Sequence, residues 1–332
     1  MADFPPLLIL IIALAIGFGA VNGFNDAANA VAASIGCRAL SPRNAIILAA
    51  CCNFAGAATG LEVAKTIGKG ILIPEAISFV TMIAALAAII VWGTIATHYG
   101  LPVSITHGFV AGLAAAGMAM LGGRAVIWSV MQRILASVAI APALGFVGGF
   151  GLMVFLLWVF RRSAPSRMRV VFSRLQWLTT AFLAYSHGKN DGQMPIGIIT
   201  MALVIYTGQA SLWDKIPWWV IVVSAAAISS GTAMGGWRVI KTMGMKVTAL
   251  EPIHGFTANL SAAAVIEGAS RLGIPVSTTH CVSSAIMGVG ATRRLSAVRW
   301  GVARRIVLAW VLTFPICGGL GYLFAWLLRP LF

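Results

Sequence analysis

Length, composition and charge exclude most classes of soluble protein. The chain has 332 residues, of which 60% are hydrophobic and only 9% are charged, whereas a soluble domain carries about a quarter charged residues. The net charge of +15 does not indicate nucleic-acid binding, because the arginines lie at the ends of apolar segments, as they do in cytoplasmic loops of membrane proteins. We therefore expect a multi-pass integral membrane protein that contacts anionic lipid and has no nucleic-acid partner.

Five apolar stretches have the composition of membrane-spanning helices. A span takes about 20 residues at 1.5 Å rise per residue, and helices are favoured because they leave no backbone group unpaired in lipid. The stretches are Leu7–Val21, Phe79–Tyr99, Ile134–Phe160, Trp218–Ser230 with its neighbours, and Ile306–Leu328. We expect the first span to be broken at Asn22-Gly23 and to resume as Asp26–Ile35. A closely packed helix of small residues is expected over Arg43–Thr59.

The two halves of the chain repeat one another. Four markers recur in the same order, and such internal repeats are typical of secondary transporters. The pairs are Asn25-Asp26 with Asn190-Asp191, Lys65-Thr66-Ile67-Gly68 with Lys241-Thr242-Met243-Gly244, Pro102–His107 with Pro275–His280, and Trp128, Arg133 and Pro142 with Trp300, Arg305 and Pro315. We divide the chain into a first transmembrane repeat over residues 1–160, a basic linker over 161–175 and a second transmembrane repeat over 176–332.

Charge predicts that the repeats are inverted. The basic segments Arg161–Arg174 and Arg293–Arg305, and the loop that holds Arg38 and Arg43, are expected to be cytoplasmic. The equivalent segments of the other half carry fewer basic residues. Equivalent loops should therefore face opposite sides of the membrane, and both termini should lie outside the cytoplasm.

The repeated Pro-Val-Ser-x-Thr-His motif predicts two re-entrant helical hairpins. Pro, Ser and Thr suit the first turn of a helix, and a helix N-terminus offers free N–H groups and a partial positive charge. Two such termini that meet at mid-membrane would form an anion site lined by hydroxyl groups. These come from Ser104, Thr106, Ser277, Thr278 and Thr279. The alternative is that the hydroxyls only cap their helices and contact no ligand.

The two Asn-Asp pairs predict a cation site. A carboxylate within a membrane segment is costly and is a functional candidate for that reason. Carboxylate and amide oxygens suit hard cations such as sodium. The candidates are Asn25, Asp26, Asn29, Asn190 and Asp191. Proton binding by one of the aspartates, or a purely structural polar contact between helices, is the alternative.

These motifs together resemble the inorganic phosphate transporter family. Gly23-Phe24-Asn25-Asp26-Ala27-Ala28-Asn29 is similar to one of its signatures, and Ser186-His187-Gly188-Lys189-Asn190-Asp191-Gly192-Gln193 is similar to the other. The resemblance implies an all-α polytopic fold of two inverted-topology repeats with broken helices and two re-entrant hairpins. It also implies phosphate near the hairpin tips, cations at the Asn-Asp pairs and a homodimer. We include Gln193 among the expected substrate-binding residues.

The sequence departs from the family pattern in ways that affect the substrate. Lys189 replaces a small residue, Met194-Pro195 replaces a common Lys-Thr pair, and Ile105 removes one hydroxyl from the first hairpin. We treat Lys189, His107 and His280 as modulators of the site. Lys189 could neutralise Asp191, replace a sodium ion, reach the anion or extend to the membrane interface. No transition metal is expected, because the histidines lack metal-ligand spacing.

The predicted function is secondary active import of inorganic phosphate coupled to sodium or protons, across the plasma membrane (the inner membrane in bacteria). No cofactor beyond the coupling ion and no enzymatic activity is expected. Sulfate is the alternative substrate, since members of the family also carry it. An anion channel and a membrane enzyme that acts on phosphorylated lipid are the other classes considered; the enzyme would need a nucleophile and base within reach of each other.

Overall fold

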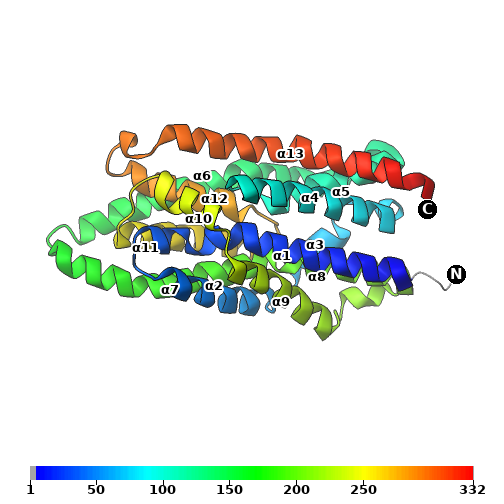
Figure 1. The fold of residues 1–332 in the computed structure, drawn as a ribbon, viewed down its shortest axis with the longest axis horizontal. Helices are drawn as coiled ribbons and strands as arrows, with labels where there is room; N and C mark the ends of the chain where they lie inside the picture. The colour runs from blue at the N-terminus through cyan, green and yellow to red at the C-terminus, as the bar shows by residue number, and fades with distance from the viewer. Residues whose placement is uncertain (1–4, 332) are drawn as a thin grey trace.

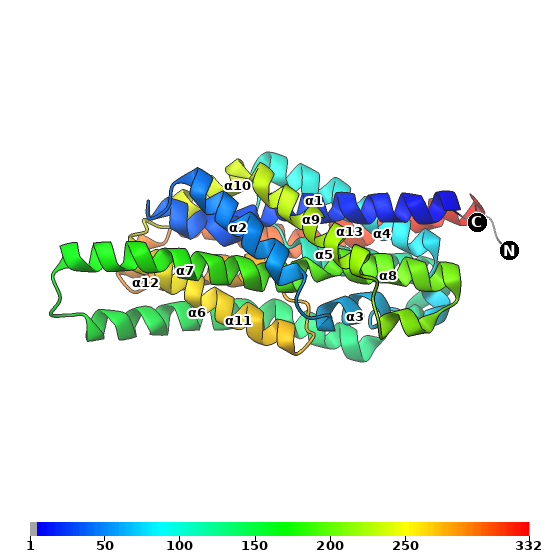
Figure 2. The same cartoon turned by 90° about the horizontal axis from the view of Figure 1, so that it is seen from below.

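The computed structural model describes residues 5–331 as a bundle of helices that lie along one long axis (Figures 1 and 2). All regular elements in this range are helical. They are α1 (Pro5–Gly36), α2 (Pro42–Ala57), α3 (Glu62–Lys69), α4 (Phe79–Tyr99), α5 (Ile105–Leu121), α6 (Trp128–Val159), α7 (Pro165–Asp191), α8 (Gln193–Thr207), α9 (Trp218–Met234), α10 (Trp237–Lys241), the π-helical turn η4 (Thr242–Lys246), α11 (Pro252–Arg271), α12 (Thr278–Ala291) and α13 (Trp300–Leu328).

The helices confirm a multi-pass membrane protein. Within the described residues, α1, α4, α5 with its extension, α6 and α13 are long and apolar enough to cross a membrane. Two bent pairs bring the count to seven: α2 with α3, bent by 70°, and α9 with α10 and η4, bent by 61°. The predicted span Phe79–Tyr99 coincides with α4, and the predicted small-residue helix is α2. The bent pairs occupy matched places in the two halves.

The predicted break in the first span is wrong, because α1 continues from Pro5 to Gly36. Gly23 does not end the helix. It allows α1 to lie directly against α9: a Cβ atom at Gly23 would stand 2.0 Å from the Ile228 carbonyl oxygen, and one at Gly231 would stand 2.0 Å from the Ala20 carbonyl oxygen. The glycine that we interpreted as a helix breaker is therefore a helix contact.

Gly23→Ala is expected to destabilise the protein. The added methyl group has no room unless α1 and α9 separate, and such overpacking costs about 1–3 kcal/mol. The matched control is Gly151→Ala in α6, where a Cβ atom would meet nothing within 4 Å. Thermal unfolding of the purified protein in detergent should show a lower midpoint for Gly23→Ala and an unchanged or higher midpoint for Gly151→Ala. Equal midpoints would contradict the close contact.

An interruption does occur in the second half, between α7 and α8. Gly192 alone separates the two helices. Pro195 has no N–H to donate to the carbonyl of Asp191, so the helical ladder is incomplete at this point. Asp191 is consequently the last residue of α7.

The two halves interleave. α5 of the first half packs on α13 of the second, and α12 of the second packs on α6 of the first; α1 likewise packs on α9, and α7 on α2. Both large hydrophobic cores draw on both halves. Phe18 and Phe109 share one core with Ile198, and Val31 shares the other with Val282 and Met287.

α1 and α7 run in opposite directions along the long axis (Figure 1). The described ends of the chain lie at one end of the bundle, and the basic α6–α7 connection lies at the other. The loops that precede α2 and α13 also lie at the end of the basic connection. The three basic segments that the sequence predicts to be cytoplasmic therefore lie at the same end of the bundle.

Candidate functional site

Two carboxylates from the two halves meet in the interior. Asp26 lies in the middle of α1 and Asp191 lies at the end of α7, and their exposed fractions are 2% and 0%. His187, one turn before Asp191, lies between them: its Nε2 atom is 3.1 Å from Asp191 Oδ2 and 3.8 Å from Asp26 Oδ2. One ligand atom of each residue falls within 4.8 Å of the others, so the three could hold a cation together.

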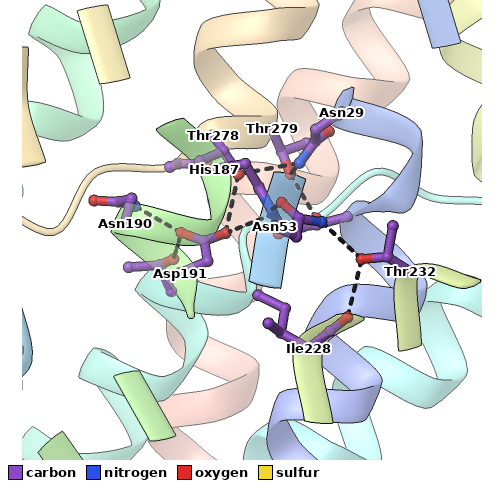
Figure 3. Close-up of polar contacts among 12 residues, drawn as sticks. Asn29, Asn53, His187, Asn190, Asp191, Ile228, Thr232, Thr278 and Thr279 are labelled. Atoms are coloured by element: carbon purple, nitrogen blue, oxygen red, sulfur yellow. Dashed lines mark hydrogen bonds and ion pairs between the residues drawn. The ribbon is translucent and has the colours of Figure 1, made fainter. Parts of the chain in front are cut away.

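The first turns of α5 and α12 bring hydroxyl groups to these carboxylates. Thr106 donates to Asp191 Oδ1 at 3.2 Å, and Thr278 donates to Asp191 Oδ2 at 3.1 Å. Thr279 donates to Asp26 Oδ1 at 3.0 Å. The structure thus joins the two sets of predicted residues, the hairpin threonines and the Asn-Asp pairs, in one buried cluster. Figure 3 shows the part of it around Asn29, Asp191 and Thr278.

The three asparagines of the motifs connect this cluster to different elements. Asn29 donates to the hydroxyl oxygens of Thr278 and Thr279, at 3.1 and 2.9 Å. Asn190 donates to Asp191 at 2.6 Å and to the carbonyl of the loop residue before Ser277 at 2.8 Å. Asn25 donates to Thr97 of α4 at 2.6 Å. Its Oδ1 atom is buried and accepts no hydrogen bond from residues 5–331, so it is available to a cation.

Ser104 and Ser277 cap their helices. The oxygen of Ser104 accepts the N–H of His107 at 3.1 Å, and the oxygen of Ser277 accepts the N–H of His280 at 3.1 Å. This is the capping role considered as an alternative above. Each serine keeps its hydroxyl proton and one lone pair for a ligand.

The assignment of Gln193 to the substrate site needs correction. Its Oε1 atom accepts the N–H groups of Val63 and Ala64, at 3.0 and 3.2 Å, and its Nε2 atom donates to the carbonyl of Thr59 at 3.1 Å. α3 has no side-chain cap of its own at Leu61. Gln193 supplies that cap from α8, which satisfies two helix-terminal N–H groups that would otherwise be buried unpaired.

Lys189 does not contact Asp191, contrary to the roles at the site that we considered. Its ammonium group pairs with Glu267 of α11 at 2.7 Å, and Arg271 donates to the same carboxylate oxygen at 2.8 Å. The reason is helical geometry: at 3.6 residues per turn, positions 189 and 191 point to nearly opposite sides of α7. Glu267 was visible in the sequence as an acid in an apolar segment, but nothing indicated its partner.

His107 and His280 are buried among aromatic rings. Their ring centroids lie 5.2 Å apart, His280 stacks on Trp310 at 4.0 Å, and His107 stacks on Phe314 at 5.5 Å. The ring nitrogens of both histidines form no hydrogen bond with the described residues. Their predicted role as modulators remains a prediction.

Sequence reasoning missed His187 and Asn53 as parts of the site. Thr232 gives its only hydroxyl proton to the Ile228 carbonyl at 2.9 Å and therefore accepts from Asn53 Nδ2 at 2.8 Å. This turns Asn53 Oδ1 towards His187 Nδ1, 2.9 Å away, so that Nδ1 carries a proton (Figure 3). The i, i+4 spacing of His187 and Asp191 within one motif was the available signal.

The hydrogen-bond chain leaves the two carboxylates in need of a proton or another positive charge. With Nδ1 as donor, a neutral His187 would direct the lone pair of Nε2 towards Asp26 and Asp191. Within the described part of the chain, no lysine or arginine pairs with either carboxylate. Buried carboxylates without a compensating charge are strongly destabilising. The geometry therefore suits a cation or a proton bound between the two aspartates.

Comparisons with known proteins agree on one family. The model of a family described as "Phosphate transporter family" matches residues 22–321. A Bacillus subtilis protein named "Probable low-affinity inorganic phosphate transporter" is 42% identical over 328 residues, which cover 98% of each chain. A Rhizobium meliloti protein of the same name is 40% identical over 311 residues, or 93% of each chain. The solved structure "The sodium-dependent phosphate transporter" superposes with a TM-score of 0.91 at 28% identity and covers 98% of this chain and 100% of its own.

Proposed function

Since the chain belongs to the phosphate transporter family, we propose that it is a symporter that moves inorganic phosphate across the plasma membrane together with sodium. Family membership makes it a transporter rather than an enzyme. One observation carries the proposal: Asp26 and Asp191, one from each half, are buried together against the first turns of α5 and α12. A cation site and an anion site therefore share the same hydroxyl groups.

This sharing provides a physical basis for coupling. Without a cation, Thr106, Thr278 and Thr279 donate to the carboxylates, and the negative charge of the site repels phosphate. A sodium ion on the carboxylates reduces that charge and frees the hydroxyl protons for an anion at the two helix N-termini. Each ligand then raises the affinity for the other, and by linkage the coupling is reciprocal.

Sodium is proposed as the coupling ion for two reasons. Apart from His187 Nε2, the side-chain ligands that Asp26, Asp191 and Asn25 offer are oxygen atoms of the kind that hard cations prefer, and the superposed structure is named as sodium-dependent. Proton coupling is the second candidate, because His187 Nε2 lies within 3.8 Å of both carboxylates. In that case the bound proton would take the place of sodium.

The proposal extends to the organisation of the repeats, the linker and the oligomer. Residues 1–160 and 176–332 act as inverted repeats in which α5 and α12 are parts of re-entrant hairpins. Residues 161–175 form a cytoplasmic linker, and alternating access moves one set of helices against the other. α12 has 14 residues, or about 21 Å of helix, which is less than the thickness of the hydrocarbon core. A homodimer is proposed from the family resemblance alone.

Uptake of labelled phosphate into proteoliposomes tests the proposal. An inward sodium gradient at equal pH should drive accumulation, and a pH gradient without sodium should not. Sulfate in tenfold excess should leave phosphate uptake largely unchanged if phosphate is the substrate. Accumulation that follows only the pH gradient would establish proton coupling, and flux that depends on neither gradient would indicate a channel.

A further inference from the structure

The repeated Lys-Thr-x-Gly segments have no role in the site described above, yet their threonines make matched contacts. Thr66 of α3 donates to the carbonyl of Gly273 at 2.7 Å. Thr242, at the start of η4, donates to the carbonyl of Gly100 at 3.0 Å. Each bond joins one half of the chain to the other. Two threonines at equivalent positions thus donate hydrogen bonds to two glycine carbonyls at equivalent positions in the opposite half.

Both glycines begin the short loops that lead to the site. Gly100 and Gly273 adopt left-handed backbone conformations, with φ of +68° and +65°, which favour glycine. Each stands four residues before a capping serine, Ser104 or Ser277. We call residues 100–103 and 273–276 the tip loops. Their positions set where α5 and α12 begin, and hence where the site threonines lie.

The hydroxyl groups of Thr66 and Thr242 each have a second acceptor within their own half. Thr66 Oγ1 is also 3.3 Å from the carbonyl of Glu62, and Thr242 Oγ1 is 3.0 Å from the carbonyl of Arg238. A threonine has one hydroxyl proton. Both threonines are half-buried. When the tip loop moves away, the proton can turn to the carbonyl in its own half, so the donor keeps a partner. Release of the loop is therefore inexpensive compared with breaking an ordinary buried hydrogen bond.

We propose that Thr66 and Thr242 are positioning residues: their hydrogen bonds to Gly273 and Gly100, which we call the latches, fix the two tip loops and keep the site threonines against Asp26 and Asp191. α3 lies towards the end of the bundle with the termini, and α10 with η4 lies towards the end with the basic connection (Figures 1 and 2). The two latches thus restrain the site from opposite sides, and release of one opens the site towards that side only. This direction of opening rests on the proposed transport function; the latch contacts themselves do not.

The test measures exposure of the tip loops by thiol alkylation. In protein whose native cysteines are replaced, Val276→Cys reports the loop held by Thr66, and Val103→Cys reports the loop held by Thr242; both valines are buried. Thr66→Val should raise the alkylation rate at position 276 by about two- to fivefold, which is at or below the effect of one lost hydrogen bond because the hydroxyl has a second acceptor, and should leave position 103 unchanged. Thr242→Val should raise the alkylation rate at position 103 by a similar factor and leave position 276 unchanged. Thr66→Ser and Thr242→Ser, which keep the hydroxyl, should match the parent.

Thr200→Val is the matched structural control. Thr200 is fully buried in α8 and donates only to the carbonyl of Ile196 in its own helix, so its loss should not change alkylation of either loop. The proposal is overturned if the alkylation rate at position 276 is the same in Thr66→Val as in Thr200→Val. It is also overturned if Thr66→Ser raises that rate as much as Thr66→Val does. Phosphate with sodium should slow alkylation in the parent protein. If phosphate has no effect while the threonine variants still differ, the proposed function fails and the latches stand.

Discussion

Asp191→Asn is expected to reduce sodium-dependent phosphate uptake by about 100-fold or more. The substitution keeps the size of the side chain but removes a buried charge that accepts hydrogen bonds from Thr106, Thr278 and Asn190. Loss of one partner of a buried charge pair costs about 3–5 kcal/mol, and the sodium ion loses its counter-charge. Initial uptake rates in proteoliposomes, at equal amounts of folded protein, measure the effect.

Asp26→Asn should have a similar effect, because Asp26 is the second carboxylate of the same site. Glu267→Gln is the matched control. Glu267 is also a carboxylate in an apolar helix, but it pairs with Lys189 and Arg271. Its loss should alter uptake only a few-fold. Retention of sodium-dependent uptake in Asp191→Asn would remove the cation role from the Asn-Asp pairs.

Thr279→Val is expected to weaken phosphate binding about tenfold or more, and to do so more than Thr106→Val. The hydroxyl of Thr279 lies 3.0 Å from both Asp26 Oδ1 and the carbonyl of Val103, and it accepts from Asn29 at 2.9 Å. Among the described residues, the side chain of Thr106 makes one hydrogen bond, to Asp191. Each unpaired buried group costs about 1–3 kcal/mol. The half-saturating phosphate concentration for uptake gives the comparison.

The conservative variants Thr279→Ser and Thr106→Ser separate loss of the hydroxyl from loss of packing. Both keep a donor and an acceptor, so we expect their half-saturating concentrations to stay within about threefold of the parent. Equal affinities for Thr279→Val and the parent would place the anion elsewhere.

The membrane class and most of the helices follow from the sequence alone. Apolar length located α4 and α13, and the repeated motifs by themselves pointed to Asp26 and Asp191. The helices can be predicted because burial in lipid is a property of the residues themselves, and the cost of an intramembrane charge is what makes Asp26 and Asp191 candidates. Because each motif occurs once in each half, the repeat also indicates which distant segments correspond to one another.

The errors arose where a role depends on which side of a helix a residue occupies. Lys189 is adjacent to Asn190 in the chain but pairs with Glu267, and Gln193 caps α3 instead of facing the substrate site. The Asn53 amide fixes the orientation of His187 from another helix, α2. Nothing local to these residues predicts such partners, because packing of the two halves decides them.

The interleaving of the halves also constrains how the protein is made. During synthesis the first half enters the membrane before α12 and α13 exist, yet α6 and α5 pack on those helices. Until translation ends, the small-residue faces of α5 and α6 and the carboxylate of Asp26 have no native neighbours. The nascent first half must therefore wait in the bilayer as an incomplete intermediate.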